Sequence, residues 1–282
     1  MTQKKELGQF FTPKQIVDFM YDLVGFCPTW KVIDPACGEG VFLLSALQRG
    51  CATVCGIDID KKAIEDCRSN LLGLEGSYHL FHQDGLVDIE TDNLFLKTHY
   101  DLVIGNPPFN SSKYRIQDKT ILRRFEWGEK EDKSDNGLQL VLFDEQVTLK
   151  KKKLRPSQAI EVLFLERFIQ LAKQGGKVAI ILPEGVFANT SARYVRDYLV
   201  ENLTIKAIIG LPTDTFREFG TTAKTCILYL KNRKPQKDNH AFIAALDSLN
   251  NDLGERQLAK ILEEFRKHEN GDTVQLGMKE VR

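Results

Sequence analysis

Residues 31–60 read KVIDPACGEGVFLLSALQRGCATVCGIDID, and this stretch indicates the fold. The apolar run KVIDP is followed by a glycine-containing turn, a helical pattern over residues 40–49 and a second apolar run, TVCGID. Near-continuous apolar runs are typical of strands that are covered on both faces, as in a parallel sheet. A strand, a helix and a second strand in this order therefore predict two parallel strands joined by a crossover helix.

The same alternation of strand and helix continues along the chain. Helical patterns cover residues 61–72, 158–173 and 192–202, beside five further apolar runs. These runs are Tyr78–Asp84, Asp101–Asn106, Lys177–Pro183, Ile205–Leu211 and Thr225–Lys231. The last two runs are joined by a loop without a clear helical pattern, which favours an antiparallel final pair. We predict an α/β fold with a Rossmann-like, doubly wound sheet of about seven strands.

The composition is that of an ordinary globular protein of 282 residues, with 42% hydrophobic and 28% charged residues. The 39 Lys and Arg residues balance the 39 Asp and Glu residues, so bulk charge does not favour nucleic acid, although a local basic groove can still do so. The sequence has neither a membrane-length apolar run nor a secretory signal, so we expect a cytoplasmic protein without membrane contact. Six cysteines without a CxxC pair indicate reduced thiols, and we expect no metal site.

We divide the sequence into three parts. Residues 1–24 hold an N-terminal motif and a helix, for which we expect Thr12 as N-cap and Pro13 as the first helical residue. Residues 25–232 form the main domain, within which residues 111–156 are a long charged insertion. Such an insertion is either a solvated surface feature or a mobile loop near a ligand. Residues 233–282 are a helical tail that can pack on the main domain or dock a partner.

The ends of the first two strands carry candidate ligand-binding groups, because ligands of doubly wound folds bind at the carboxyl ends of strands. Gly38 and Gly40 let the backbone approach a ligand closely, although a plain tight turn has the same pattern. Asp58, 24 residues after Asp34, can accept both hydroxyls of a ribose; its alternative role is a helix cap, for which Asp60 is the better candidate. Since no pyrophosphate cradle is evident, a nucleoside without a phosphate chain fits, and S-adenosylmethionine is such a cofactor.

Polar groups also follow the next two strands. Asp84 can accept a hydrogen bond from an adenine amino group or act as a turn residue. The motif Asn106-Pro107-Pro108-Phe109 is the most specific signal, because its two prolines remove two backbone donors and fix φ. The Asn106 side-chain oxygen and the Pro107 carbonyl are then acceptors that can point at one amino group. Phe109 adds a flat face for a planar ring.

The motifs GQFFTP, DPACGEG, GIDID, QDGL, NPPF and ILPEGVF occur in this order between residues 8 and 187. This order resembles that of the amino-methyltransferases that act on adenine N6 in DNA, and most of all the methylation (M) subunit of type I restriction-modification systems. The resemblance implies methyl transfer from S-adenosylmethionine to a flipped-out adenine of double-stranded DNA. We expect a separate specificity subunit or target-recognition domain to read the DNA sequence, because only 50 residues follow residue 232.

The resemblance also implies roles for individual residues. Cofactor binding is implied for Gln9, Phe10, Phe11, Thr12, Pro13, Asp34, Ala36, Cys37, Gly38, Gly40, Asp58, Ile59 and Asp84. Catalysis is implied for Asn106, Pro107, Pro108 and Phe109. Phe216, or alternatively Phe219, is the candidate for the aromatic ring on the other face of the target base. Candidates for phosphate contacts, or else for a solvated loop, are Lys113, Arg115, Arg123, Arg124 and Lys150–Lys153.

Two other functions are compatible with the sequence. Strings similar to NPPF also occur in protein-glutamine methyltransferases and in ribosomal RNA base methyltransferases, so the acceptor can be an RNA base or a glutamine side chain. The second alternative is a non-catalytic, DNA-binding scaffold subunit of a restriction complex. The intact NPPF motif and Asp58 argue against the scaffold.

Overall fold

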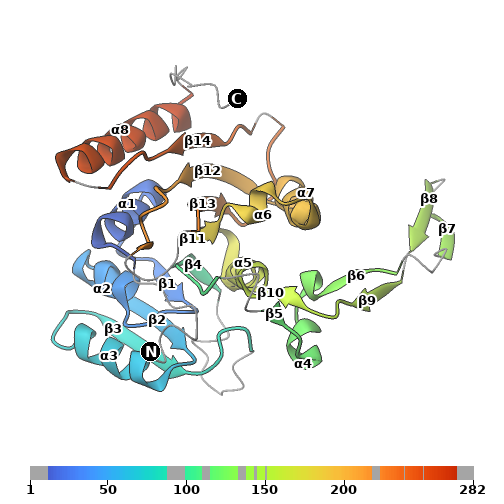
Figure 1. The fold of residues 1–282 in the computed structure, drawn as a ribbon, viewed down its shortest axis with the longest axis horizontal. Helices are drawn as coiled ribbons and strands as arrows, with labels where there is room; N and C mark the ends of the chain where they lie inside the picture. The colour runs from blue at the N-terminus through green and yellow to red at the C-terminus, as the bar shows by residue number, and fades with distance from the viewer. Residues whose placement is uncertain are drawn as a thin grey trace.

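The computed structural model describes residues 12–87, 99–109, 115–132, 138–142, 145–149, 151–217, 223–237, 239–249 and 251–271. At its centre is an eight-stranded sheet with the strand order β14-β12-β13-β11-β4-β1-β2-β3 (Figure 1). The strands are β1 (Lys31–Asp34), β2 (Thr53–Asp58), β3 (Ser77–His82), β4 (Tyr100–Gly105), β11 (Ala172–Pro183), β12 (Thr204–Gly210), β13 (Thr225–Lys231) and β14 (Phe242–Ala245).

Most pairs in this sheet are parallel, as the apolar runs predicted. β1 pairs with β2 and β4, β2 with β3, β4 with β11 and β12 with β14, all in parallel. β13 is antiparallel to both of its neighbours, β11 and β12. The predicted α/β sheet with an antiparallel final pair is therefore confirmed, and β14 adds an eighth strand beside β12.

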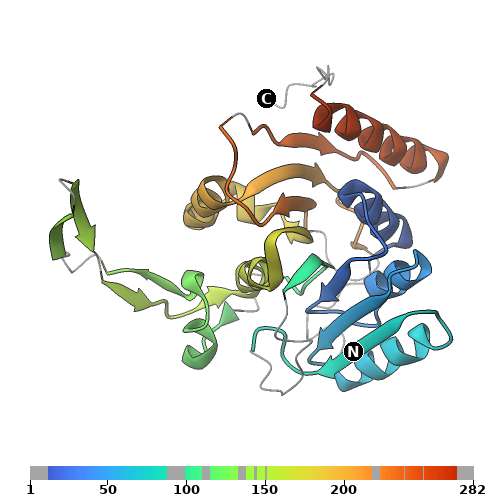
Figure 2. The same ribbon diagram turned by 180° about the vertical axis from the view of Figure 1, so that it is seen from behind.

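Helices cover both faces of the sheet and enclose two cores. One core combines buried side chains of α1, α2, α3 and α8, and the other combines those of α5 and α7 on the opposite face (Figures 1 and 2). The long helices are α1 (Lys14–Val24), α2 (Val41–Gln48), α3 (Lys61–Leu71), α5 (Ile160–Leu171), α7 (Arg193–Asn202) and α8 (Asn251–Glu269). The short ones are α4 (Lys119–Leu122), α6 (Gly185–Ala188), η2 (Glu126–Gly128) and η3 (Thr190–Ala192).

The start of α1 differs from the prediction. The helix begins at Lys14, and Pro13 is the flanking residue, with φ −55° and ψ 137° and a carbonyl that accepts from the backbone N–H of Ile16 at 2.9 Å. The expected cap at Thr12 is therefore wrong. The Thr12 hydroxyl instead accepts a hydrogen bond from Nδ2 of Asn106 at 3.1 Å, so it connects this segment to the end of β4.

The C-terminal part of the described chain packs on the domain. β14 extends the sheet, and α8 contacts α1 (Figure 1). The ring of Phe265 in α8 lies edge-to-face against Phe242 and Tyr229, with centroid distances of 5.6 and 6.1 Å. A partner-docking role for residues 233–282 stays a prediction.

A two-stranded ribbon projects from the domain in the region of the predicted charged insertion (Figure 1). Its stem is the antiparallel pair β6–β9, and β7 and β8 form a second antiparallel pair beyond it. At its base, β5 pairs with β10 just before α5. These strands are β5 (Arg115–Ile116), β6 (Glu129–Glu131), β7 (Leu138–Leu142), β8 (Glu145–Leu149), β9 (Lys152–Leu154) and β10 (Gln158–Ala159).

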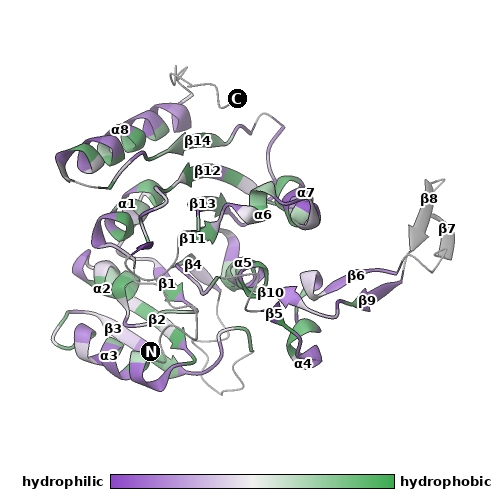
Figure 3. Cartoon of the chain, viewed as in Figure 1, coloured by the Kyte–Doolittle hydropathy of each residue, from purple (hydrophilic) through white to green (hydrophobic). Residues whose placement is uncertain are grey.

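The hydropathy pattern follows this architecture. Figure 3 shows hydrophobic residues concentrated on the central strands and on the helix faces turned toward them, and hydrophilic residues along the outer face of α8. Within the described residues, none of the helices combines the length and apolar character required to cross a membrane.

Candidate active site

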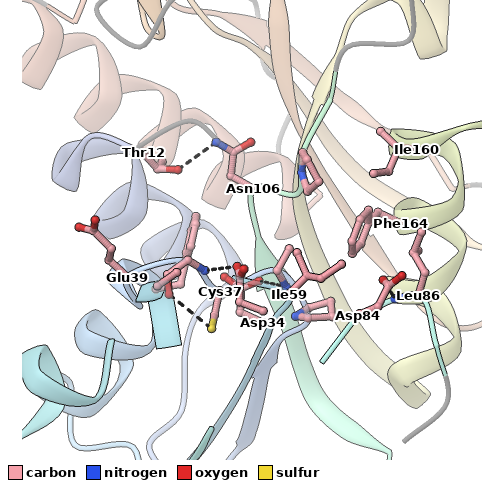
Figure 4. A pocket seen from close by; sticks show the side chains of 18 of the residues that line it. Thr12, Asp34, Cys37, Glu39, Ile59, Asp84, Leu86, Asn106, Ile160 and Phe164 are labelled. Carbon is pink, nitrogen blue, oxygen red and sulfur yellow. Dashed lines mark hydrogen bonds between the residues drawn. The ribbon is translucent and has the colours of Figure 1, made fainter. Parts of the chain in front are cut away.

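The carboxyl ends of β1, β2, β3 and β4 meet at one edge of the sheet and enclose a cavity of about 240 Å³ (Figure 4). This is the edge at which a doubly wound sheet binds ligands. Of the residues implied by the sequence, those that line the cavity are Thr12, Asp34, Ala36, Cys37, Gly38, Asp58, Ile59, Asp84, Asn106 and Pro108. The structure therefore brings together residues of five separate motifs.

The loop after β1 is fixed by backbone and side-chain hydrogen bonds. Asp34 accepts from the N–H of Ala36 at 3.0 Å through Oδ1, and the N–H of Gly38 donates to Oδ2 of Asp58 at 2.7 Å. Gly40 is the N-cap residue before α2, with φ +85°, and a Cβ there would lie 2.3 Å from Sγ of Cys67. Gly40 is thus required by backbone conformation and packing, and it lies behind the cavity wall rather than on it.

Burial raises the pKa values of the two carboxyl groups beside this loop, those of Asp34 and Asp58. Asp34 is 1% exposed, and burial together with the nearby Asp58 raises its pKa to about 8. Burial also raises the pKa of Asp58, against the hydrogen bonds that it accepts from the backbone. A cationic ligand group beside Asp34 would favour its ionised form, because an opposite charge offsets desolvation.

At the end of β2, one acid caps a helix and the other lines the cavity. The side chain of Asp60 accepts from the N–H of Lys62 at 2.8 Å and caps α3, as predicted for this residue. Asp58 instead accepts from the N–H groups of Gly38 and Asp60, and it lines the cavity. Next to it, the side chain of Ile59 is 55% exposed at the cavity wall, where it offers an apolar surface to a ligand.

Asp84 is both a turn residue and part of the cavity wall. Its Oδ1 accepts from the N–H of Leu86 at 2.9 Å, and its carbonyl accepts from the N–H of Val87 at 3.0 Å. This turn holds the carboxylate at the edge of the cavity. The two interpretations of Asp84 are therefore compatible.

The NPPF motif follows β4 directly and lies against the first loop. A Cβ on Gly105 would be 2.5 Å from Oδ1 of Asp34, so only glycine permits this close approach. Nδ2 of Asn106 donates to the Thr12 hydroxyl, and Figure 4 shows the amide oxygen on the side away from Thr12. Pro108 lines the cavity beside Asn106.

The two candidate stacking rings contact each other. Phe109 and Phe216 are 2% and 1% exposed, and their rings lie edge-to-face with centroids 6.2 Å apart. Neither ring lines the cavity in this arrangement. A planar base can lie between them only if the rings separate. The alternative candidate, Phe219, lies outside the described residues.

The other predicted residues have different surroundings. Pro13 flanks α1, whereas Gln9, Phe10, Phe11, Lys113 and Lys150 lie outside the described residues. Lys152 and Lys153 form ion pairs with Glu126 and Asp132 at 3.1 and 2.7 Å. Arg115 donates to Ser157, and the side chains of Arg123, Arg124 and Lys151 are exposed. Over the described part of the chain, no three or more His, Cys, Asp or Glu side chains cluster as metal ligands would.

Sequence reasoning missed the wall that α5 supplies. Ile160 and Phe164, one helical turn apart, line the cavity opposite the β1 loop, together with Leu86 (Figure 4). Their spacing of four residues predicts that they share one face of a helix, but the sequence alone does not predict what that face contacts.

The fold is that of class I S-adenosylmethionine-dependent methyltransferases. It is similar to a solved structure so described from Listeria monocytogenes, with TM-score 0.65 and 21% identity over 90% of this chain and 71% of that one. It is also similar to a chain in a structure of the type I R-M system, with TM-score 0.72 and 19% identity over 99% of this chain and 55% of that one.

The chain belongs to the N-6 DNA Methylase family, whose model matches residues 1–279. A curated relative is the type I restriction enzyme MjaIX methylase subunit of Methanocaldococcus jannaschii, which is 24% identical over 94% of this chain and 46% of its own length. The chain spans about half the length of the first curated relatives that it matches.

We predict that Asp34→Asn raises the free energy of unfolding relative to the wild type, and increasingly so as pH rises. The folded protein holds the Asp34 proton up to about pH 8, whereas the ordinary pKa is 3.8, so wild-type stability falls between these values as pH rises. An amide keeps the acceptor for Ala36 and cannot ionise. Urea unfolding at several pH values from about 5 to 8 measures the difference.

Asp101→Asn is the matched control. Partial burial acts to raise the pKa of Asp101, but the hydrogen bonds from Lys173 and from the backbone N–H of Lys31, with the charges of both lysines, outweigh it and hold the pKa below its ordinary value. The stability that Asp101 contributes is therefore already complete at about pH 5. The stability lost in Asp101→Asn should therefore be the same at every pH from about 5 to 8. A pH-independent effect of Asp34→Asn would contradict the buried, protonated carboxyl.

Proposed function

We propose that this chain transfers a methyl group from S-adenosylmethionine to N6 of an adenine flipped out of double-stranded DNA. In this proposal it is the modification subunit or catalytic core of a restriction-modification system and works in the cytoplasm. The observation that carries the proposal is the position of Asn106, next to the cavity and held by Thr12 through its Nδ2. Family membership supports DNA as the substrate.

The cavity residues fit the cofactor in chemical character. The carboxylate of Asp58 suits ribose hydroxyls, and that of Asp84 suits an exocyclic amino group. Ile59 and Phe164 provide apolar surface for a purine ring. When bound, S-adenosylmethionine supplies an electrophilic methyl group on a sulfonium.

Asn106 and Pro107 activate the acceptor nitrogen in this mechanism. The lone pair of N6 is delocalised into the adenine ring, so the nitrogen is a weak nucleophile. Oδ1 of Asn106 and the Pro107 carbonyl each accept a hydrogen bond from one of the two N–H groups on N6. These hydrogen bonds return electron density to N6 and favour its tetrahedral geometry. Preorganised acceptors of this kind stabilise charge as it develops, and they also position the nitrogen. The N–H proton becomes acidic only after the methyl group has been transferred, and it is then released to solvent water.

Phe109 and Phe216 hold the extrahelical base. Flipping costs a few kcal/mol, and stacking on an aromatic ring returns about 1–3 kcal/mol per base. The base enters between the two rings, which exchange their mutual edge-to-face contact for contact with the base. Arg123, Arg124 and Lys151 are exposed, and in this proposal they contact DNA phosphates.

A further subunit or domain reads the DNA sequence in this proposal. The chain spans about half the length of relatives that are named methylase subunits, and one solved neighbour belongs to a type I R-M system. DNA and a separate specificity subunit or target-recognition domain are therefore the proposed partners.

The experiment compares host DNA from strains with the gene, without it, and with Asn106→Ala or Asn202→Ala. Nucleoside mass spectrometry and modified-base sequencing should find N6-methyladenine in a defined DNA motif with the wild type. Asn106→Ala should lower it by at least about 100-fold, the order expected for loss of one preorganised polar group. Asn202→Ala, which loses only a bond to the Tyr198 carbonyl at the end of α7, should keep it.

The same strains separate the alternative acceptors. Gene-dependent methylation of an RNA base or of protein glutamine, with DNA unchanged, would overturn the proposal. Gene-dependent binding to DNA without methylation of any acceptor would favour the scaffold.

We predict that Thr12→Val lowers kcat about tenfold, a larger effect than the one on cofactor affinity. The substitution keeps the shape of the side chain but removes the oxygen that accepts from Asn106, so the amide loses its fixed orientation. Thr12→Ser keeps that oxygen and should retain most of the activity. Steady-state kinetics with calorimetric cofactor binding measures both quantities. Equal losses for the valine and serine variants would contradict the orienting role of the hydroxyl.

A further inference from the structure

Arg167, in the middle of α5, holds the loop that follows β3. Its side chain is buried, with 8% of the residue exposed. Nε donates to the Gly85 carbonyl at 3.0 Å, and Nη2 donates to the Val87 carbonyl at 3.2 Å. The rigid fork of a guanidinium reaches two carbonyls at once, which a lysine ammonium on its flexible stem does less well.

The loop that Arg167 holds is also confined from the other side. A Cβ on Gly85 would lie 2.0 Å from the Pro35 carbonyl oxygen and 3.3 Å from the Phe164 ring. Gly85 is thus closely packed between the loop after β1 and helix α5. Its buried carbonyl needs a donor, because an unpaired buried acceptor is costly. Arg167 supplies that donor.

Asp84 precedes this clamped segment directly. Its side chain accepts from Leu86 and its carbonyl from Val87, so the turn ties the Asp84 carboxylate to the backbone that Arg167 grips. Arg167 itself is not part of the cavity wall, whereas Asp84, Gly85 and Leu86 are. The hydrogen bonds from Arg167 to the Gly85 and Val87 carbonyls therefore connect it to the cavity wall through this turn.

We propose that Arg167 is a positioning residue for adenine recognition: it holds the turn after β3 so that the Asp84 carboxylate faces the amino group of the cofactor's adenine. This inference rests on the proposed function and adds a residue that does not touch the ligand. The same helix therefore contributes an apolar wall, through Phe164, and the polar anchor of the adjacent turn that carries Asp84.

The neighbouring residue on α5 provides a matched control. Glu166 is also 8% exposed, but its carboxylate accepts from the N–H groups of Glu126 and Trp127, at 2.5 and 2.8 Å, at the base of the projecting ribbon. Burial raises the pKa of Glu166 to about 7, so Glu166→Gln resembles its protonated form. A variant at position 166 disturbs the same buried helix without touching the Asp84 turn.

The test measures calorimetric binding of S-adenosylhomocysteine and of its analogue with hydrogen in place of the adenine amino group. A hydrogen bond to a charged acceptor predicts that the wild type prefers the amino-bearing ligand by about tenfold or more. Arg167→Gln should reduce this preference to about twofold or less, and Arg167→Lys should restore part of it. Glu166→Gln should keep the full preference. Thermal unfolding identifies variants that do not fold. If Arg167→Gln does not fold, Arg167→Lys is the variant that tests the inference.

A double-mutant cycle shows whether Arg167 acts through Asp84. Asp84→Ala should abolish the preference, and adding the Arg167 substitution should then change it no further. The inference is overturned if Arg167 variants keep the wild-type preference, if Glu166→Gln loses it equally, or if the wild type shows none. A wild-type protein that binds neither ligand would instead overturn the proposed function of the cavity.

Discussion

The hydrogen bond from Nδ2 of Asn106 to the Thr12 hydroxyl connects residues 94 positions apart in the sequence. An amide has one acceptor end and one donor end, so fixing the donor also fixes where the oxygen lies. The proposed chemistry needs that oxygen in one orientation, because a rotated amide would present donors to an amino group. The segment that leads into α1 and the end of β4 thus depend on each other.

Close packing at the sheet edge makes this bond possible. The absence of a side chain on Gly105 allows the end of β4 to lie against Asp34. The Gly38 N–H bonded to Asp58 ties the first loop to β2, and Arg167 holds the turn after β3 from the opposite side. The site is therefore a set of strand ends held together by short-range contacts, most of which involve the backbone. Burial of Asp34 and Asp58 raises the pKa values of both groups, and a cationic ligand group beside them would offset this effect of burial.

Local patterns were sufficient to predict most of the sheet. Each of the seven apolar runs forms a strand. The strands in the middle of the sheet are covered on both faces, where residues must be apolar regardless of tertiary detail. Asp60 was predicted as a cap from its position alone, and the structure confirms it. Thr12 had an equally good local signal, and that prediction is wrong because a distant amide binds its hydroxyl.

Contacts between distant segments were not predictable in the same way. The sequence shows that Ile160 and Phe164 share a helix face, but only the packing of α5 on the sheet shows that this face borders the cavity. Arg167 has no local signal that separates a solvated arginine from one buried against two carbonyls. The mutual contact of Phe109 and Phe216 likewise depends on how two loops meet.

A crystal structure with a bound sulfonium analogue and a duplex that carries an extrahelical adenine tests the central claim most directly. We predict that N6 of that adenine lies within hydrogen-bonding distance of both the Asn106 side-chain oxygen and the Pro107 carbonyl, with the Asn106 amide nitrogen still bonded to Thr12. An adenine seated in the site with N6 bonded to neither oxygen, or an amide oxygen turned toward Thr12, would contradict the account.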